Sequence, residues 1–314
     1  MRYSDIALKV LAAKECGIIK TNAQFWREFS DRERFEEEIL KYDNIEKMAE
    51  KIYSELVSFD YEGGFVCIYD DEFPLINRKV KNNSEKPYLL FYKGDLSLLE
   101  DLNKNVAVIG LLDPDKDIIK RESEIVRQLV EEELVIVSGL AAGCDTIAHK
   151  TCLDNSGKTV AILPTQINKV YPAENRIFAE EIVNNGGLLL SEYYKEPANR
   201  HEAISRFIER DRLQAMFAKA IILIASYRKG EGDSGSRHAM ESARKYGIER
   251  YVMYNYKIDE NNERFGLNKD LAYSKCVDKV KILKTDSIGH IKSIKNLDLV
   301  RDPDLLDHNQ LTFL

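Results

Sequence analysis

Two glycine-containing loops each follow a short apolar run and precede a helical pattern. The first spans 137–146 and the second spans 230–236. Glycine lets a backbone approach a ligand closely, and a helix N-terminus offers unpaired N–H groups to an anion. The first loop has neither a Walker nor a G-x-G-x-x-G pattern. We predict phosphate-facing loops, with a tight turn and a mobile surface loop as the alternatives. The residues concerned are Ser138, Gly139, Leu140, Gly143, Asp145, Ser234, Gly235 and Ser236.

Within the first loop, Asp145 is expected to cap the following helix, because its carboxylate can accept from the N–H groups of the next turn. A larger side chain at Gly143 is expected to occlude the loop without unfolding the chain. His149 lies one turn later. We interpret it as a partly buried histidine with satisfied hydrogen bonds rather than as a catalytic group.

Three arginines follow in a helical pattern near 200–218. Arg206 and Arg210 are four residues apart and share a helix face, whereas Arg212 points elsewhere. The guanidinium fork matches the oxygens of a phosphate, which predicts an anion contact. The alternative is ion pairing with Glu202, Glu209 and Asp211 of the same helix.

Tyr171 and Asn175 stand in a turn that enters a helix, where Tyr171 could stack on a base.

Enzymatic signatures are missing from the sequence. Ser138 has no G-x-S-x-G context, the histidines show no H-E-x-x-H spacing, and the five cysteines form no Cys-x-x-Cys pair. We predict no catalytic residue, no metal and no cofactor.

The elements that position these residues alternate from residue 105 onward. Apolar runs are found at 106–109, 134–137, 159–163, 187–190, 220–225 and 250–254, with helices expected near 117–132, 145–154, 174–185, 200–218 and 235–246. Runs of this kind are typical of strands that are buried on both faces. The pattern predicts an α/β protein with a doubly wound, mostly parallel sheet, in which ligands bind beyond the carboxyl ends of the strands.

The chain divides into three parts by pattern. Residues 1–60 show helical spacing of apolar residues and predict a small helical domain. Residues 61–285 contain two short aromatic-rich strands and the alternating region, and residues 286–314 form a tail.

Composition limits the cellular setting. The 314 residues are 44% hydrophobic and carry a net charge of −7, yet residues 200–250 hold eleven Lys/Arg against seven Asp/Glu. A local basic segment suits a specific anionic ligand, and a solvated helix face is the alternative. No apolar run is long enough to span a membrane, and no signal peptide is visible at the N-terminus. With an odd number of unpaired cysteines, we expect a cytoplasmic protein.

At these residues the chain resembles the DprA/Smf family of DNA-processing proteins. The matching segments are 137–145 with Ala148-His149, Tyr171-Pro172-x-x-Asn175, Leu190-Ser191-Glu192, Phe207-x-x-Arg210-Asp211-Arg212, Ser234-Gly235-Ser236 and Pro87-x-Leu-Leu-Phe-Tyr-x-Gly94. The resemblance covers roughly residues 60–255.

The resemblance implies an extended Rossmann fold and a non-enzymatic, dimeric protein. Such a protein protects single-stranded DNA and assists loading of the recombinase RecA during transformation. Carried over by position, Ser138, Gly139 and Gly143 would line the DNA pocket, and Arg210, Arg212, Ser234 and Gly235 would complete it.

The chain departs from the family at several points. Where the family has Gly-Ser-Arg, this chain has Gly110-Leu111-Leu112-Asp113, and Arg-Asn-Arg has become Arg210-Asp211-Arg212. Both changes are expected to weaken phosphate binding. We also expect a divergent member that lacks the C-terminal winged-helix-like domain. The last residues, Gln310, Leu311, Phe313 and Leu314, look like a sliding-clamp peptide, and a terminus that packs on its own domain is the alternative.

A second functional class stays open at this stage. A nucleotide-binding sensor or nucleotide-processing protein on the same fold, for example in a defence pathway, would use the stretch 232–239. The related phosphoribohydrolases have glutamate where this chain has Ala239, and Glu241 falls two residues later. A DNA binder should show length-dependent, salt-sensitive affinity, whereas a sensor should saturate with a mononucleotide.

Overall fold

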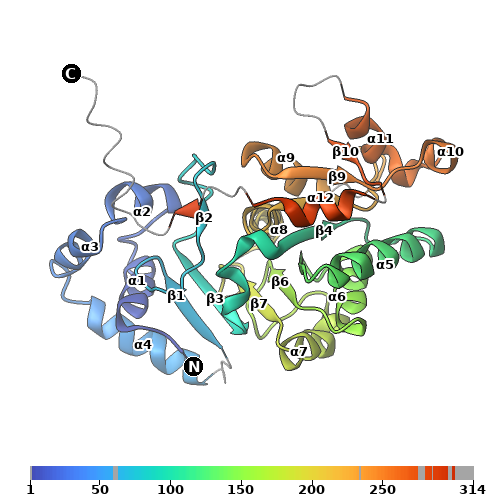
Figure 1. Cartoon of the computed structure of the whole chain (residues 1–314). Coiled ribbons are helices and arrows are strands. Elements are labelled where there is room, and N and C mark those ends of the chain that lie inside the picture. Colours follow the sequence, from blue (N-terminus) through green and yellow to red (C-terminus); the bar gives the residue numbers. More distant parts are fainter. Residues whose placement is uncertain are drawn as a thin grey trace, which may run out of the picture.

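The computed structural model describes residues 2–58, 63–232, 235–274, 280–284, 286–295 and 299–300. A nine-stranded sheet forms its centre, and a helical unit packs at one end of that sheet (Figure 1). No described helix is both long and apolar enough to cross a membrane.

The sheet is parallel over most of its width, in the order β1-β3-β7-β6-β5-β4-β8-β9-β10. The parallel strands are β4 (Asn105–Ile109), β5 (Val135–Ser138), β6 (Thr159–Leu163), β7 (Leu188–Ser191), β8 (Ala220–Leu223), β9 (Glu249–Val252) and β10 (Lys281–Ile282). Almost every residue of β4 to β9 is buried, because helices cover both faces. The predicted α/β fold with a doubly wound, mostly parallel sheet is confirmed.

The helices fall into two groups around the sheet. The first group is α5 (Lys116–Glu131), α6 (Cys144–Asp154) and α7 (Arg176–Asn184), and the second is α8 (Arg200–Met216) and α9 (Ser236–Lys245). Three short helices follow, α10 (Tyr256–Asp259), α11 (Gly266–Ala272) and α12 (Ser287–Ser293). The strand order reverses between β4 and β8, so right-handed crossovers place α5–α7 on one face and α8–α9 on the other. The reversal creates the switch point at which α/β proteins bind ligands.

Two antiparallel strands extend the sheet toward the N-terminal unit. β1 (Gly64–Cys67) pairs with β3 (Leu89–Gly94), and β3 pairs with β7 so that Phe91 lies opposite Ser191. The beginning of β3 therefore lies at the carboxyl edge of the parallel strands. The outer edge of β1 is partly covered by Arg2, whose carbonyl accepts the N–H of Phe65 at 2.9 Å.

The N-terminal unit consists of α1 (Asp5–Glu15), α2 (Asn22–Glu28), α3 (Arg32–Ile39) and α4 (Ile45–Ser58). Ser4, Thr21 and Asp31 cap the first three helices by accepting a backbone N–H. The unit shares one apolar core with β1 and β3, in which Phe25 stacks on Tyr88 at 4.2 Å between ring centres.

Part of the segment 286–314 lies on the sheet. Ile288 and Ile291 of α12 are buried in the main core, and β11 (Leu299–Val300) pairs with β2 (Ile76–Asn77). The proposed boundaries at residues 60 and 285 stay predictions. Residues 310–314, which carry the clamp-like peptide, lie outside the described residues.

Asn268 of α11 fixes the carboxyl ends of β8 and β9. It is fully buried, and its Nδ2 donates to the carbonyls of Leu223, Ile224 and Met253 at 2.9–3.1 Å. This amide therefore ties two neighbouring strand ends to the helix that crosses them.

We predict that Asn268→Ala lowers the free energy of unfolding by about 1–3 kcal/mol, because buried carbonyls lose their partner. Urea unfolding followed by circular dichroism measures the change. Asn261→Ala, at an exposed position, should change it little. Equal stabilities of the two variants would contradict this role.

Candidate functional site

The loops that follow β4, β5 and β8 meet at the carboxyl edge of the sheet. The backbone N–H of Cys144 donates to the carbonyl of Leu111 at 2.8 Å, and the hydroxyl of Ser236 donates to the carbonyl of Gly110 at 3.0 Å. The structure thus brings the two predicted glycine loops to opposite sides of the loop after β4. Ser138 lies beneath them, fully buried, and donates to the carbonyl of Val108 at 2.6 Å.

The first loop is filled by a carboxylate of the protein itself. Asp145 is buried, and its Oδ2 accepts from the N–H groups of Gly139 and Ala141 at 3.2 and 3.4 Å. The N-cap position of α6 is Gly143, and no side chain caps it. The expectation that Asp145 caps this helix is therefore wrong, because its carboxylate turns back into the loop. Burial raises the pKa of Asp145, and the Arg210 guanidinium opposes that rise.

The glycines of this loop make room for neighbouring protein atoms. A Cβ at Gly139 would lie 1.0 Å from a terminal nitrogen of Arg210. Gly143 has φ of +73°, and a Cβ there would lie 2.3 Å from the carbonyl oxygen of Leu111. A valine at 143 would therefore clash with backbone and strain its own, so we expect it to destabilise the fold as well as to fill the loop.

Leu140 and Asn175 complete this loop from the inside. Leu140 is buried with φ of +55°, and its carbonyl accepts from the Asn175 side chain at 2.9 Å. Asn175 also donates to the hydroxyl of Thr146 at 2.8 Å. Both predicted residues thus hold the loop in place from beneath.

The three predicted arginines lie on α8, and all are buried. Arg206 pairs with Glu202 at 2.6 Å, and Arg210 pairs with Asp145 at 3.5 Å and with Asp211 at 3.2 Å. The alternative of ion pairing is thus confirmed for two of them. That these arginines contact phosphate stays a prediction. Such a contact requires each arginine to leave its carboxylate partner for the phosphate.

Arg212 makes the best-formed ion pair of the site. Its two terminal nitrogens each donate to one oxygen of Glu192 at 2.7 Å, and its Nε donates to the carbonyl of Glu85 at 2.8 Å. The side chains of Arg212 and Glu192 are 10% and 12% exposed. This pair joins α8 to the end of β7 and to the segment before β3.

The carboxylates that depart from the family pattern have cations of their own. Asp211 lies against Arg210, and Asp113 lies 3.7 Å from Arg264. Their charge is thus partly compensated within the protein.

The second loop leads into the N-terminus of α9. Ser234 lies outside the described residues. Gly235 is exposed and takes the N-cap position of α9, and no side chain of the described residues caps the helix there. Arg237 follows in the first turn, and its buried Nε has no hydrogen-bond partner in the described part of the chain. An anion at this end of α9 would meet both the helix dipole and a guanidinium.

Two aromatic side chains, one of them largely exposed, contact each other at this edge. Tyr171 is 58% exposed and meets Phe207 of α8 edge to face, with ring centres 5.7 Å apart. A base could stack on the exposed Tyr171 ring, as the sequence predicted for this residue.

Sequence reasoning missed a set of unpaired cations at the same edge. No carboxylate of the described residues lies within 4.0 Å of their charged groups, and each stands after a parallel strand, at or near the start of the next helix. They are Arg176, Arg200, Lys229 and Arg237. Lys/Arg at the first positions of helices after strands was the signal that could have found them.

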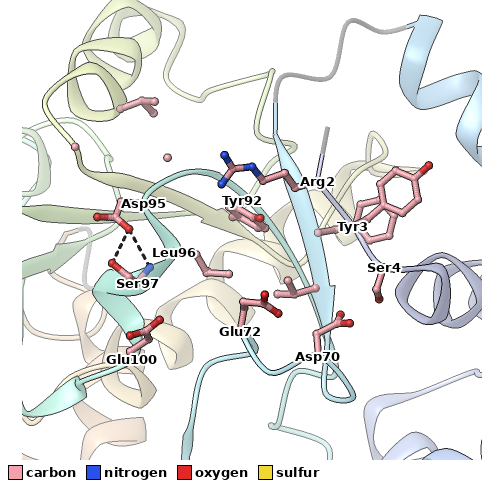
Figure 2. A pocket seen from close by; sticks show the side chains of 15 residues that line it. Arg2, Tyr3, Ser4, Asp70, Glu72, Tyr92, Asp95, Leu96, Ser97 and Glu100 are labelled. Atoms are coloured by element: carbon pink, nitrogen blue, oxygen red, sulfur yellow. Dashed lines mark hydrogen bonds between the residues drawn. The ribbon is translucent and has the colours of Figure 1, made fainter.

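A cavity of about 710 Å³ lies at the opposite edge (Figure 2). Gly94 lines it and pairs with Leu188, the first residue of β7, which places the cavity at the amino ends of the parallel strands. Its charged lining is Arg2 against Asp70, Glu72, Asp95 and Glu100. This excess of carboxylates disfavours a phosphate in this cavity.

Comparison with known proteins identifies the family. The family model of DNA recombination-mediator protein A matches residues 64–273, which is two thirds of the chain. The chain belongs to this family. It is 36% identical to the DNA processing protein DprA of Streptococcus pneumoniae over 51% of this chain and 54% of that protein. It is 32% identical to the protein Smf of Synechocystis over 56% and 43%. The chain thus spans about half the length of these curated relatives.

Solved structures of the family share the fold. The crystal structure of DprA from Streptococcus pneumoniae superimposes with a TM-score of 0.60 and 25% identity, and the match covers 92% of this chain and 94% of that one. The structure of DNA processing protein A from Helicobacter pylori, described by its single-stranded DNA binding mode, gives a TM-score of 0.55 and 28% identity. That match covers 68% of this chain and 90% of the other.

Two buried titratable groups lie behind the first loop of this family member. The hydroxyl of Thr159 donates to a backbone carbonyl, so Nδ1 of His149 donates to that hydroxyl at 2.6 Å. Nε2 of His149 has no partner among the described residues, and burial lowers the pKa of His149 to about 3. His149 is therefore more deeply buried than expected, with one nitrogen satisfied.

Glu122 of α5 is the second such group. It is fully buried, and neither of its carboxyl oxygens has a hydrogen-bond partner among the described residues. Burial raises the pKa of Glu122 well above its usual range, and the Cys144 thiol offsets this only in part. The folded protein thus keeps a proton on Glu122 that the unfolded chain releases.

We predict that Arg212→Ala lowers the free energy of unfolding by about 3–5 kcal/mol, because it leaves Glu192 buried without a partner. The double variant Arg212→Met/Glu192→Leu should recover most of that loss. Chemical denaturation measures both, with Arg32→Ala in an exposed pair as the control, where we expect about 0–1 kcal/mol. A small loss for Arg212→Ala would mean that the pair is dispensable.

Glu122 makes stability depend on pH. Above about pH 4.3, the unfolded chain loses the proton that folded Glu122 retains, so stability falls by about 1.4 kcal/mol per pH unit up to the folded pKa. Glu122→Gln removes this loss. We predict that its stability relative to the unmodified chain increases steadily from pH 5 to pH 7 in urea unfolding. A constant difference over that range would show that Glu122 is ionised in the folded protein.

Proposed function

We propose that this chain binds single-stranded DNA and catalyses no reaction on it. The observations that carry the proposal are the exposed Tyr171 ring and the cations at the carboxyl edge that have no carboxylate of the described residues within 4.0 Å. Family membership over residues 64–273 supports it, as does the likeness to the Helicobacter pylori protein, whose structure is described by its single-stranded DNA binding mode.

The physical basis is the combination of a phosphate track with a stacking surface. Sequence-tolerant binding of single strands uses a line of cations along the backbone and aromatic rings under the bases. Arg176 and Arg200 are the first residues of α7 and α8, and Arg237 is the second residue of α9. These helices start at one edge of the sheet, so the three charges follow that edge. The buried α8 arginines would serve this site by holding the loops in position.

The nucleotide-processing alternative receives little support from the geometry. A glycosidic bond is cleaved with help from a general acid or base that reaches the ligand. Ala239 is buried at the position where the related hydrolases have glutamate. Glu241 is instead exposed and pairs with Arg244 at 2.6 Å.

The finer proposal concerns partners, and it rests on the family resemblance alone. We propose that a homodimer of this chain protects single strands and assists RecA loading in recombination or transformation. Sedimentation of the chain with and without an oligonucleotide tests the dimer, and RecA filament formation on coated single strands tests the loading step.

We predict salt-sensitive binding of a labelled single-stranded oligonucleotide by fluorescence anisotropy. Each cation that contacts a phosphate contributes about 0.7 to the slope of log K against log salt. Arg176→Ala/Arg200→Ala/Arg237→Ala should therefore reduce this slope by about 2. Lys104→Ala, directly before β4 at the amino edge, should leave it unchanged.

A mononucleotide competitor separates the two functional classes. Binding that a mononucleotide does not displace supports the DNA-binding proposal. Full displacement, or no binding of the oligonucleotide, overturns it in favour of a nucleotide sensor.

A further inference from the structure

The N-terminal helical unit reaches the edge of the sheet at which DNA binding is proposed. β3 runs antiparallel to β7, so the residues just before Leu89 lie beside the segment that follows Ser191. Arg212 confirms this closeness, since its Nε donates to the carbonyl of Glu85 at 2.8 Å. Lys86 is the next residue along the chain, and it contacts α2.

Trp26 and Lys86 form a joint aromatic and cationic surface at this place. The indole N–H of Trp26 donates to the carbonyl of Lys86 at 3.1 Å, and the ammonium of Lys86 lies 5.2 Å from the centre of the indole ring. Both side chains are partly exposed. The indole hydrogen bond fixes the ring in one orientation, so little further ordering is needed to stack a base on it.

Positive charge at this surface is not neutralised. No carboxylate of the described residues lies within 4.0 Å of Lys14, Lys81 or Lys86, whose side chains all reach solvent. Burial and the charge of Lys81 lower the pKa of Lys86. Two cations held near each other without a counter-ion are stabilised when an anion binds between them.

The acids nearby are already paired. Glu15 pairs with Lys195 at 2.5 Å, Glu28 pairs with Arg27 at 2.5 Å, and Glu192 pairs with Arg212. Lys14 lies 6.0 Å from the centre of the Tyr88 ring. Burial lowers the pKa of Lys14, and the charges of Glu192 and Glu15 oppose that change.

We propose that a single strand bound at the carboxyl edge continues onto the N-terminal unit. One base stacks on Trp26, and the adjoining phosphates contact Lys86, Lys81 and Lys14. The inference rests on the proposed function and adds a second contact to it. Short strands then occupy only the edge beside Tyr171, whereas longer strands engage both surfaces and bind more tightly.

Trp26 is the sole tryptophan of the chain, so its fluorescence reports on this surface alone. Unlabelled oligothymidylates of about 6 and about 20 nucleotides are titrated against the full chain, since single-strand sites span about 4–16 nucleotides. We expect the longer strand to quench the tryptophan emission and the shorter strand to bind without quenching. Anisotropy of labelled versions of the same strands measures binding independently.

Two variants test the contact by affinity. Trp26→Phe and Lys86→Gln should each weaken binding of the longer strand about threefold to tenfold and leave the shorter strand unaffected, as expected for loss of one stacked base or one phosphate contact. Lys47→Gln on α4, which Figure 1 shows away from α2, is the matched control and should change neither affinity. Circular dichroism verifies that each variant is folded.

The outcomes separate this inference from the proposed function. Binding of both strands with constant tryptophan emission, and with Lys86→Gln indistinguishable from Lys47→Gln, overturns the second contact and leaves the first intact. Failure of both strands to bind in anisotropy overturns the proposed function itself.

Discussion

The Arg210 guanidinium occupies the space above Gly139, and the rest of the carboxyl edge is arranged around it. Its partner Asp145 also accepts from the amides of the β5–α6 loop, so one carboxylate joins α8 to that loop. This contact is possible only because position 139 has no side chain. At the end of this loop, the N–H of Cys144 donates to the carbonyl of Leu111 after β4. The neighbouring carbonyl of Gly110 accepts from the Ser236 hydroxyl at the start of α9. Four segments that are remote in sequence are thus fixed by one buried ion pair.

A division of roles follows among the charged residues of this edge. Buried arginines on α8 have carboxylates as partners and define the shape of the edge. Among the described residues, the cations at the beginnings of α7, α8 and α9 have no carboxylate within 4.0 Å, so in the proposed function they are the ones that release counterions when DNA binds. Under the proposed function, DNA affinity and the shape of this edge therefore depend on different sets of arginines.

The fold was predictable from the sequence because burial on both faces leaves uniform apolar runs between helical patterns, as at β4 and β6. Asn175 and Gly143 were recognised as special positions for the same reason, since turn residues stand out between such runs. The direction of Asp145 was not predictable, because its carboxylate is held by an arginine 65 residues away. The sequence also could not show that Arg212 pairs with a carboxylate of the described residues whereas Arg200 does not, because only the folded chain brings Glu192 to Arg212.

The covering of β1 by Arg2 has a consequence for how copies of this chain can assemble. An open sheet edge is a template on which another strand can form hydrogen bonds. Here one edge is partly covered by the chain's own first residues, and the opposite edge is formed by β10, which is only two residues long. Continuous growth of the sheet from one molecule to the next is thereby discouraged. In the proposed homodimer, contact between copies would then rest on side chains, which distinguish partners in a way that backbone pairing does not.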